Sequence, residues 1–132
     1  PHERHEQVLM DLSLNLRAVV AQQLLPTQQG GRCAAIEILL SSPRVVDLIR
    51  KGRIDELKQA MAGSRDAGMQ TFDQALYALY QAGQVSQQVA LAHADSANDL
   101  RLMIKQGDAV ASGKPLDAQV PSHLALRDGD DY

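Results

Sequence analysis

Aromatic residues and cysteine are scarce in this sequence. Only 3% of its 132 residues are aromatic, tryptophan is absent, and Cys33 is the single cysteine. Because 45% of the residues are nonetheless hydrophobic, the chain is able to bury one aliphatic core of a size typical for a single domain. A lone cysteine excludes an internal disulfide and fits a reducing compartment.

The sequence also lacks the patterns of membrane-spanning and nucleic-acid-binding proteins. No apolar run approaches the ~20 residues that cross a bilayer. No basic block occurs and the formal net charge is −3, so neither nucleic acid nor an anionic membrane is expected as a direct ligand. The chain begins at Pro1 with neither an initiator methionine nor a signal peptide, and we expect it to be a piece of a longer protein.

Motifs of catalysis and nucleotide binding are missing as well. Neither G-x-x-x-x-G-K-[ST] nor G-x-G-x-x-G occurs. His2 and His5 form an H-x-x-H pair without a third ligand, so solvated polar residues are the better interpretation. His93 is isolated, and Ser, Cys and His are too scattered for a catalytic triad. We therefore predict that the chain by itself holds no catalytic residue and no metal.

The stretch from Gly68 to Gly83, GMQTFDQALYALYQAG, predicts a central helix with both ends specified. Thr71 and Gln74 form a T-x-x-Q capping box, and Gly83 suits the left-handed residue after a helix. Apolar residues recur in between at helical spacing and predict one buried stripe. These residues are Phe72, Ala75, Leu76, Leu79 and Tyr80.

The beginning of the chain predicts one long helix, from about Arg4 to Leu24. Its apolar residues recur every four positions on a face broad enough to be covered on more than one side. Arg17 lies on the polar remainder, where the pattern fits either a solvated arginine or one that faces a phosphate or a neighbouring subunit. The apolar row consists of Val8, Leu12, Leu16, Val20 and Leu24.

Residues 32–40, RCAAIEILL, predict a strand after a glycine-containing turn. With Leu24 and Leu25 ahead of the turn, this strand is able to form a β-hairpin. Glu37 interrupts one of its apolar faces. Since no second acid or histidine lies near it in sequence, we interpret Glu37 as a hydrogen-bonded strand carboxylate and not as a catalytic base.

Shorter helices are predicted after the strand. One is capped by Ser42, another begins at Ile54, and two more follow Ser86 and Ser96. The fold class that follows is mainly α with a small β element. Residues 108–132 are rich in Gly, Pro, Ser and Asp, and we expect them to form a mostly disordered tail.

Positive charges gather on the first of these shorter helices. Cations in a last helical turn complement the helix dipole, which is one interpretation of the cluster. The other is a surface for an acidic partner, on which rim charges would speed and orient association. This predicted interaction surface consists of Arg44, Asp47, Arg50, Lys51 and Arg53.

Four segments occur in the order and spacing of a known family: LNLRAVVAQQLLPT, RCAAIEILL, P-x-x-x-x-LIR and GMQTFDQALYALYQAG. Over residues 1–106 the sequence resembles the C-terminal part of the type IV pilus retraction ATPases, the PilT/PilU branch of the secretion ATPases. The family's AIRNLIRE signature is replaced by RVVDLIRK, in which only Leu48, Ile49 and Arg50 match. This departure, together with MDLSLNL and HADSANDLRLMIK, is more similar to PilU than to PilT.

The resemblance implies a motor. Family members are hexameric rings that hydrolyse ATP with Mg to drive pilus disassembly at the cytoplasmic face of the inner membrane, and their Walker motifs lie upstream of the point that matches Pro1. It implies that residues 1–41 end the RecA-like ATPase core, with Arg17 near the nucleotide, and that residues 42–107 form a helical bundle. It also implies three partners: further copies in a homo-hexamer, a PilT-like ATPase and the inner-membrane pilus platform protein.

An alternative hypothesis is a small cytoplasmic helical adaptor with no enzymatic parent. Such a protein would bind others through the central helix and residues 44–53. A Walker A sequence upstream of Pro1 would decide for the motor.

Overall fold

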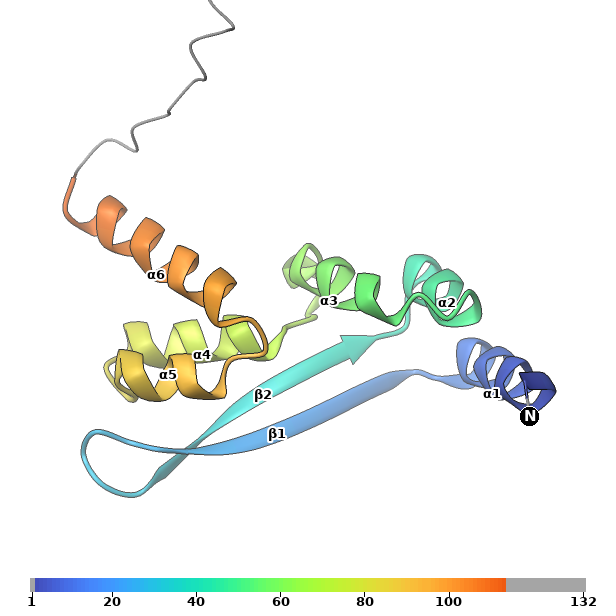
Figure 1. Cartoon of the computed structure of the whole chain (residues 1–132), viewed down its shortest axis with the longest axis horizontal. Helices are drawn as coiled ribbons and strands as arrows, with labels where there is room; N and C mark the ends of the chain where they lie inside the picture. The colour runs from blue at the N-terminus through green and yellow to red at the C-terminus, as the bar shows by residue number, and fades with distance from the viewer. Residues whose placement is uncertain (1, 114–132) are drawn as a thin grey trace, which may run out of the picture.

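Helices dominate the structure, and one hairpin is its β element (Figure 1). The computed structural model describes residues 2–113, and this part is mainly α with a small β element, as the sequence predicts. None of its helices is both long and apolar enough to cross a membrane. The elements of residues 2–113 are α1 (His2–Asn15), β1 (Ala18–Pro26), β2 (Arg32–Leu40), α2 (Pro43–Arg50), α3 (Ile54–Ala62), the 3-10 helix η1 (Arg65–Ala67), α4 (Phe72–Gln81), α5 (Gln87–His93) and α6 (Ala97–Ala111).

The hairpin of β1 and β2 is paired along its whole length. The antiparallel ladder ends with Pro26 opposite Arg32. In the turn, Gly30 and Gly31 have φ values of 88° and 90°, a left-handed backbone that glycine adopts without a Cβ clash. The strand predicted for residues 32–40 is therefore confirmed.

The single long helix predicted for residues 4–24 is wrong. Helix α1 ends at Asn15, and β1 follows. Val20 and Leu24 fit the i, i+4 spacing of a helix, but a spacing of four also fits the two-residue period of a strand. The β-branched Val19 and Val20 favour an extended backbone. The backbone groups of β1 then form hydrogen bonds with β2, a strand that is distant enough in sequence that the local apolar pattern does not indicate the pairing.

The central helix begins and ends where its caps predict. Thr71 Oγ1 accepts the amide of Gln74 at 3.2 Å, and Gln74 Oε1 accepts the amide of Thr71 at 3.1 Å, which completes the capping box. Gly83 has a φ of 71°, in the left-handed region. Ala75 and Leu76 are buried, and the other three members of the predicted stripe are partly buried.

The other predicted helix starts are confirmed too. Ser42, Ser86 and Ser96 each accept the backbone amide of the residue three positions further on. Each serine thereby satisfies one of the amides that a helix leaves unpaired in its first turn.

The expected onset of disorder at residue 108 is wrong for residues 108–111, because α6 continues to Ala111. Gly107 hides this continuation in the sequence, since glycine often marks a helix end. In the structure it marks close packing instead, because a Cβ at Gly107 would lie 2.1 Å from the hydroxyl oxygen of Tyr77. Residues 112 and 113 follow the helix as a turn, and residues 114–132 of the predicted tail lie outside the described residues.

Two clusters of buried apolar side chains hold the described residues together. The α2–α3 cluster joins α2 and α3 to α1 and to the base of the hairpin, and the α4–α6 cluster joins α4, α5 and α6 to the tip of the hairpin. No residue belongs to both. The buried members are Val45, Leu48, Ile49, Leu57, Ala60, Met61 and Met69 in the first cluster, and Leu25, Ala35, Ala75, Leu76, Val85, Ala90, Leu100 and Ile104 in the second.

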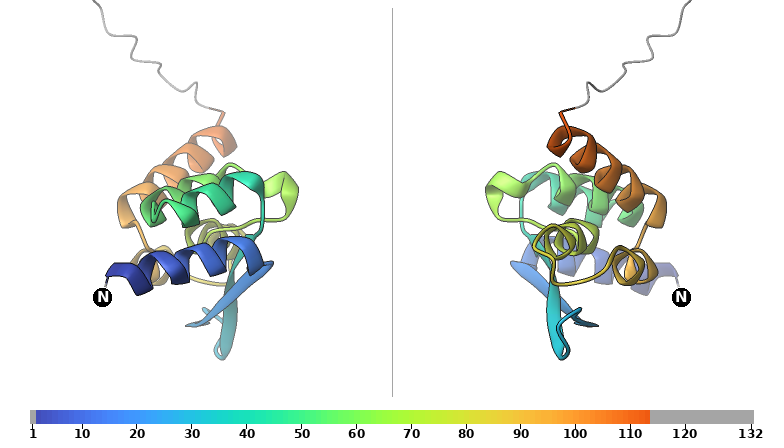
Figure 2. Two further views of the ribbon diagram at one scale, coloured as in Figure 1. Left: turned by 90° about the vertical axis from the view of Figure 1, so that its right-hand side faces the viewer. Right: turned by 90° about the vertical axis from the view of Figure 1, so that its left-hand side faces the viewer.

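One face of the hairpin and both flanks of α1 are apolar and open. Helices α3 to α6 lie on one side of the hairpin, which projects beyond them in the end-on views (Figures 1 and 2). On its open face Val20 and Leu24 of β1 flank Gln22, which pairs with Ile36 of β2. Val20, Leu24 and Ile36 are exposed. An exposed apolar surface of this kind is typical of an interface. The exposed apolar residues of α1 are Val8, Met10, Leu12 and Leu14.

Truncation of Leu76 to alanine is predicted to destabilise the protein by ~2–5 kcal/mol, as for other leucines that are fully buried. Chemical denaturation measures this loss. Leu102→Ala on α6 is the matched control, because Leu102 is 55% exposed and should cost less than ~0.5 kcal/mol. Equal losses for the two variants would contradict the assignment of Leu76 to the core.

Candidate functional site

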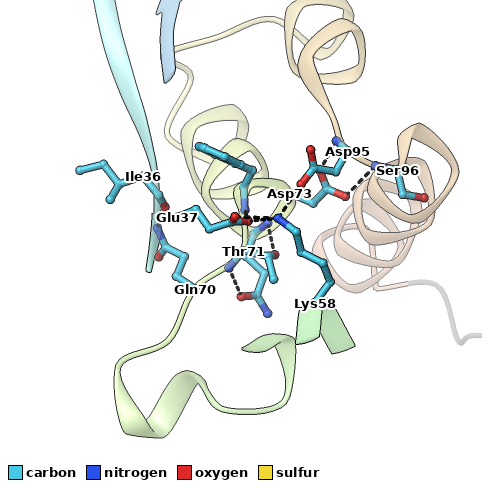
Figure 3. A network of polar contacts seen from close by, with 10 residues as sticks. Ile36, Glu37, Lys58, Gln70, Thr71, Asp73, Asp95 and Ser96 are labelled. Carbon is cyan, nitrogen blue, oxygen red and sulfur yellow. Dashed lines mark hydrogen bonds and ion pairs between the residues drawn. The ribbon is translucent and has the colours of Figure 1, made fainter. Parts of the chain in front are cut away.

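A lysine on α3 joins three parts of the chain beside the start of α4 (Figure 3). Lys58 Nζ lies 2.6 Å from Glu37 Oε1 on β2 and 3.0 Å from Asp95 Oδ2 in the α5–α6 loop. It also lies 5.6 Å from the centre of the Phe72 ring, at cation–π distance. We call this arrangement of Glu37, Lys58, Phe72 and Asp95 the polar junction.

Among the three charged residues of the polar junction, Glu37 is the most shielded from water, with a side chain 16% exposed. Besides Lys58, it accepts the backbone amide of Phe72 at 3.0 Å, one of the free amides at the start of α4. The prediction that Glu37 is a hydrogen-bonded strand carboxylate is therefore confirmed. Such bonds compensate the cost of removing a carboxylate from water.

Asp73, in the first turn of α4, holds the α5–α6 loop beside the polar junction. Its two carboxylate oxygens accept the amides of Asp95 at 2.8 Å and Ser96 at 3.0 Å. A carboxylate at this position also interacts favourably with the positive end of the helix dipole. The start of α4 thus organises β2, α3 and the loop before α6.

The charge of Lys58 is stabilised by its partners. Partial burial by itself would lower the pKa of Lys58, but the hydrogen bonds to Glu37 and Asp95 and the charges of both carboxylates outweigh it and raise the pKa above 10.5. Lys58 is therefore fully charged at neutral pH, and the ion pairs are present there.

A cleft of about 380 Å³ lies next to the polar junction, between α3 and α6. Three carboxylates, of Asp73, Asp95 and Asp99, and the ammonium of Lys58 lie along it, and Met103 and Ala62 give it apolar walls. Within residues 2–113 no group of three or more His, Cys, Asp or Glu side chains is placed to hold a metal ion. The charged side chains along the cleft instead form hydrogen bonds and ion pairs that connect β2, α3, α4 and the α5–α6 loop.

Three members of the predicted interaction surface lie on α2, on the side away from its buried residues: Arg44, Asp47 and Arg50. Lys51 and Arg53 follow the end of that helix. Two of its cations are paired locally. Lys51 Nζ lies 2.9 Å from Asp47, and Arg53 Nε lies 2.9 Å from Glu56. Both pairs are exposed, so each contributes little to stability.

Arg44 and Arg50 differ from these paired cations. Both are exposed, and neither forms an ion pair with another residue of the described part of the chain. Of the three positions in RVVDLIRK that match the AIRNLIRE signature, Leu48 and Ile49 are buried in the α2–α3 cluster, whereas Arg50 is on the surface. Packing in the core accounts for the match at Leu48 and Ile49. Arg50 is the matching residue that a partner protein could contact.

Arg17 lies between α1 and β1, not within a helix as predicted. Its side chain is exposed, and its carbonyl accepts the amide of Ser41 at 2.9 Å, which places it close to the start of α2. Proximity of Arg17 to a nucleotide stays a prediction.

The sequence analysis missed Lys58, Asp73 and Asp95. They are 15 and 22 positions apart in the sequence, and each by itself fits a solvated surface residue. The available signal was the capping box, since an acidic residue in the turn that follows it is placed to accept amides from a neighbouring loop. Only the fold brings the three together.

Replacement of Glu37 by glutamine is predicted to destabilise the protein by about 1 kcal/mol, because it removes one charge of a well-shielded pair while its partner Lys58 is 48% exposed. Asp47→Asn, which breaks only the exposed pair with Lys51, is the control and should cost less than about 0.5 kcal/mol. Urea denaturation measures both. An equal cost for the two variants would contradict the role given to Glu37.

The pH dependence of this stabilisation follows from the raised pKa of Lys58. A lysine with a folded-state pKa above its unfolded value of 10.5 stabilises the protein fully below pH 10.5. The difference in unfolding free energy between the wild type and Glu37→Gln should therefore be constant near neutral pH and shrink as the pH rises through the folded-state pKa.

Comparison with known proteins identifies relatives of this chain, although no protein-family model matches it. It is 65% identical over 108 residues to the type IV pilus ATPase PilU of Pseudomonas aeruginosa, which covers 81% of this chain and 28% of PilU. It is 34% identical over 90 residues to PilT of the same organism, covering 68% of this chain and 26% of PilT. The chain thus spans little more than a quarter of each relative.

A solved structure agrees with these relatives. The crystal structure of the pilus retraction motor PilT with bound ADP superposes on 78% of this chain, and on 28% of that chain, with a TM-score of 0.68 and 31% sequence identity. The similarity extends to sequence, with a higher identity to PilU than to PilT. The chain belongs to the PilT/PilU family of type IV pilus ATPases.

Proposed function

We propose that this chain is the C-terminal portion of an ATP-hydrolysing motor for type IV pilus retraction and twitching motility. The observation that carries the proposal is the 65% identity to PilU over 108 residues. The adaptor hypothesis has no comparable support, because both relatives are ATPases by name. Sequence upstream of Pro1 with a Walker A motif is what the proposal requires.

In this proposal ATP and Mg bind outside the present chain. The chain has no G-x-x-x-x-G-K-[ST] loop, the element whose backbone amides hold phosphates. Its contribution is structural: residues 1–41 complete the RecA-like core and residues 42–107 form the helical bundle. The open apolar face, with Val20, Leu24 and Ile36, would pack against the rest of that core.

The interaction surface on α2 is proposed to contact a protein outside the chain's own subunit. Candidate partners are a neighbouring copy in a homo-hexamer, a PilT-like ATPase, and the pilus platform protein at the cytoplasmic side of the inner membrane. Arg44 and Arg50 support this assignment, since their guanidinium groups are exposed and form no ion pair within residues 2–113. Arginine is suited to such contacts because its planar group binds carboxylates with two hydrogen bonds.

Charge reversal at Arg44 and Arg50, both to glutamate in the intact protein, is predicted to abolish most twitching motility or partner co-purification. Folding and intrinsic ATP hydrolysis should be unchanged, because both side chains point into solvent. The readouts are motility, pull-down with a PilT-like ATPase, and ATP turnover.

The matched control reverses two cations on α6, Arg101→Glu and Lys105→Glu, which are also exposed. This control makes the same change in net charge at a different surface and should leave motility and binding intact. Equal impairment by both double variants would indicate a general effect of charge, and full activity of the Arg44/Arg50 variant would refute the interface on α2.

The chain by itself is predicted to bind ATP·Mg no more tightly than about millimolar and to show no ATP turnover, because it has no phosphate loop. Isothermal titration calorimetry tests the affinity. A micromolar dissociation constant would contradict the placement of the nucleotide site outside this chain.

A further inference from the structure

The outer edge of β2, the side that faces away from β1, is only partly paired. Ile38 exchanges two backbone hydrogen bonds with Gln70, of 2.8 and 3.0 Å, so its amide and its carbonyl point away from β1. Along an antiparallel strand every second residue directs its backbone groups to the same side. The backbone groups of Ile36, Ala34 and Arg32 therefore face outward as well.

The chain turns away from this edge after a single residue pair. Thr71 is already the N-cap of α4, so no described residue continues beyond Gln70 along β2. The side chain of Gln70 reaches one position further and donates to the carbonyl of Ile36 at 2.7 Å (Figure 3). The amide of Ile36 and both backbone groups of Ala34 form no hydrogen bond with another residue of the described range 2–113. An unpaired edge of this kind is a template for a further strand.

A groove of about 230 Å³ lies along the same edge, between β2 and α4. Its α4 side is apolar, and two of the three residues there are alanines, which leave room for a backbone to approach. A strand edge beside a helix is suited to β-augmentation, in which main-chain bonds give affinity and alternate side chains give specificity. The lining residues are Ala34, Ile36 and Gln70 on the strand side, and Ala75, Ala78 and Leu79 on α4.

The sequence after α6 contains one short segment whose pattern suits this edge. Residues 124–128 read LALRD, in which Leu124, Leu126 and Asp128 alternate with Ala125 and Arg127. Such alternation gives a strand one face with two leucines and a carboxylate, and a second face with a small residue and a cation. The segment contains neither proline nor glycine, the residues that most often interrupt a strand.

The segment is also long enough to reach the groove. Ala111, near the end of α6, lines one pocket together with Tyr80 and Gln81 of α4, so the chain leaves α6 beside the helix that borders the groove. Leu124 is 11 positions after Gly113. An extended chain of that length spans up to roughly 36 Å, and a helix with its side chains is only about 10–12 Å across.

We propose that residues 124–128 bind in this groove as a third strand, antiparallel to β2, in the direction that Gln70 already has. Two of the facing pairs are apolar, and the third brings a carboxylate to Arg32, which is exposed and forms no ion pair within residues 2–113. A shift by two residues in either direction loses this charge pair. The facing pairs are Leu124 with Ile36, Leu126 with Ala34, and Asp128 with Arg32.

The added strand closes an edge of the sheet that is otherwise open to pairing with another chain. Its backbone bonds use the amide of Ile36 and the amide and carbonyl of Ala34, which have no partner within the described residues. This inference does not depend on the function proposed above.

Cysteine cross-linking in the full chain tests this register, because Cys33 is the single cysteine. The register places residue 127 directly opposite Cys33, in a pair without mutual hydrogen bonds, where Cα atoms lie about 4.5 Å apart and a disulfide fits. Residue 125 lies on the same side but diagonal to Cys33, at about 7–8 Å. With oxidised glutathione as the oxidant, Arg127→Cys is therefore expected to form an intramolecular disulfide about ten-fold faster than the matched control Ala125→Cys.

A proline in the added strand provides a second test that leaves residues 2–113 unchanged. In the Arg127→Cys chain, Leu126→Pro removes the amide that would donate to the carbonyl of Ala34, and it should slow disulfide formation to the rate of Ala125→Cys. Ala118→Pro, which introduces the same residue ahead of the strand, should leave the rate unchanged. Mass spectrometry of the products measures both rates.

Three results would overturn the third strand. Equal rates for Arg127→Cys and Ala125→Cys would show that the segment meets Cys33 by random collision. An Arg127→Cys rate that Leu126→Pro does not change would exclude main-chain pairing. A disulfide that joins two chains, and not two residues of one chain, would assign the edge to a second copy.

Discussion

The hydrogen bonds of Glu37 are the constraint on which the arrangement of the other elements depends. A carboxylate on an otherwise apolar strand face must be compensated when helices cover it. Lys58 from α3 and the amide of Phe72 at the start of α4 do so, and they come from either side of the turn between these helices. The position of one strand residue thus fixes where two helices can approach the hairpin.

The open face of the hairpin exposes apolar side chains to solvent in the described part of the chain. Val20, Leu24 and Ile36 are exposed on one face of the hairpin although their chemistry suits a core. Under the proposed function, the rest of the ATPase core would cover this face. The breadth of apolar residues on α1, which led us to expect cover on more than one side, fits the same explanation.

The surface of α2 shows how packing and function separate within one short motif. In RVVDLIRK, the apolar residues that match the family signature lie in the core, while Asp47 and Lys51, which do not match it, neutralise each other on the surface. On α2, Arg44 and Arg50 are the exposed arginines, and neither forms an ion pair within residues 2–113.

Local chemistry in the sequence determined the caps of α2, α4, α5 and α6, the strand β2 and the mainly α fold class, because a cap or an alternating face depends on residues only a few positions apart. The tertiary structure decided the rest. Residues 18–24 form a strand because β2 offers them main-chain hydrogen-bond partners. An apolar spacing of four residues fits a helix as well as a strand, so the sequence pattern alone could not decide between them. Gly107 lies inside α6, where the hydroxyl group of Tyr77 packs so closely that a Cβ would clash with it. Lys58 and Asp95 are 37 positions apart, and only folding turns two separate surface charges into one contact.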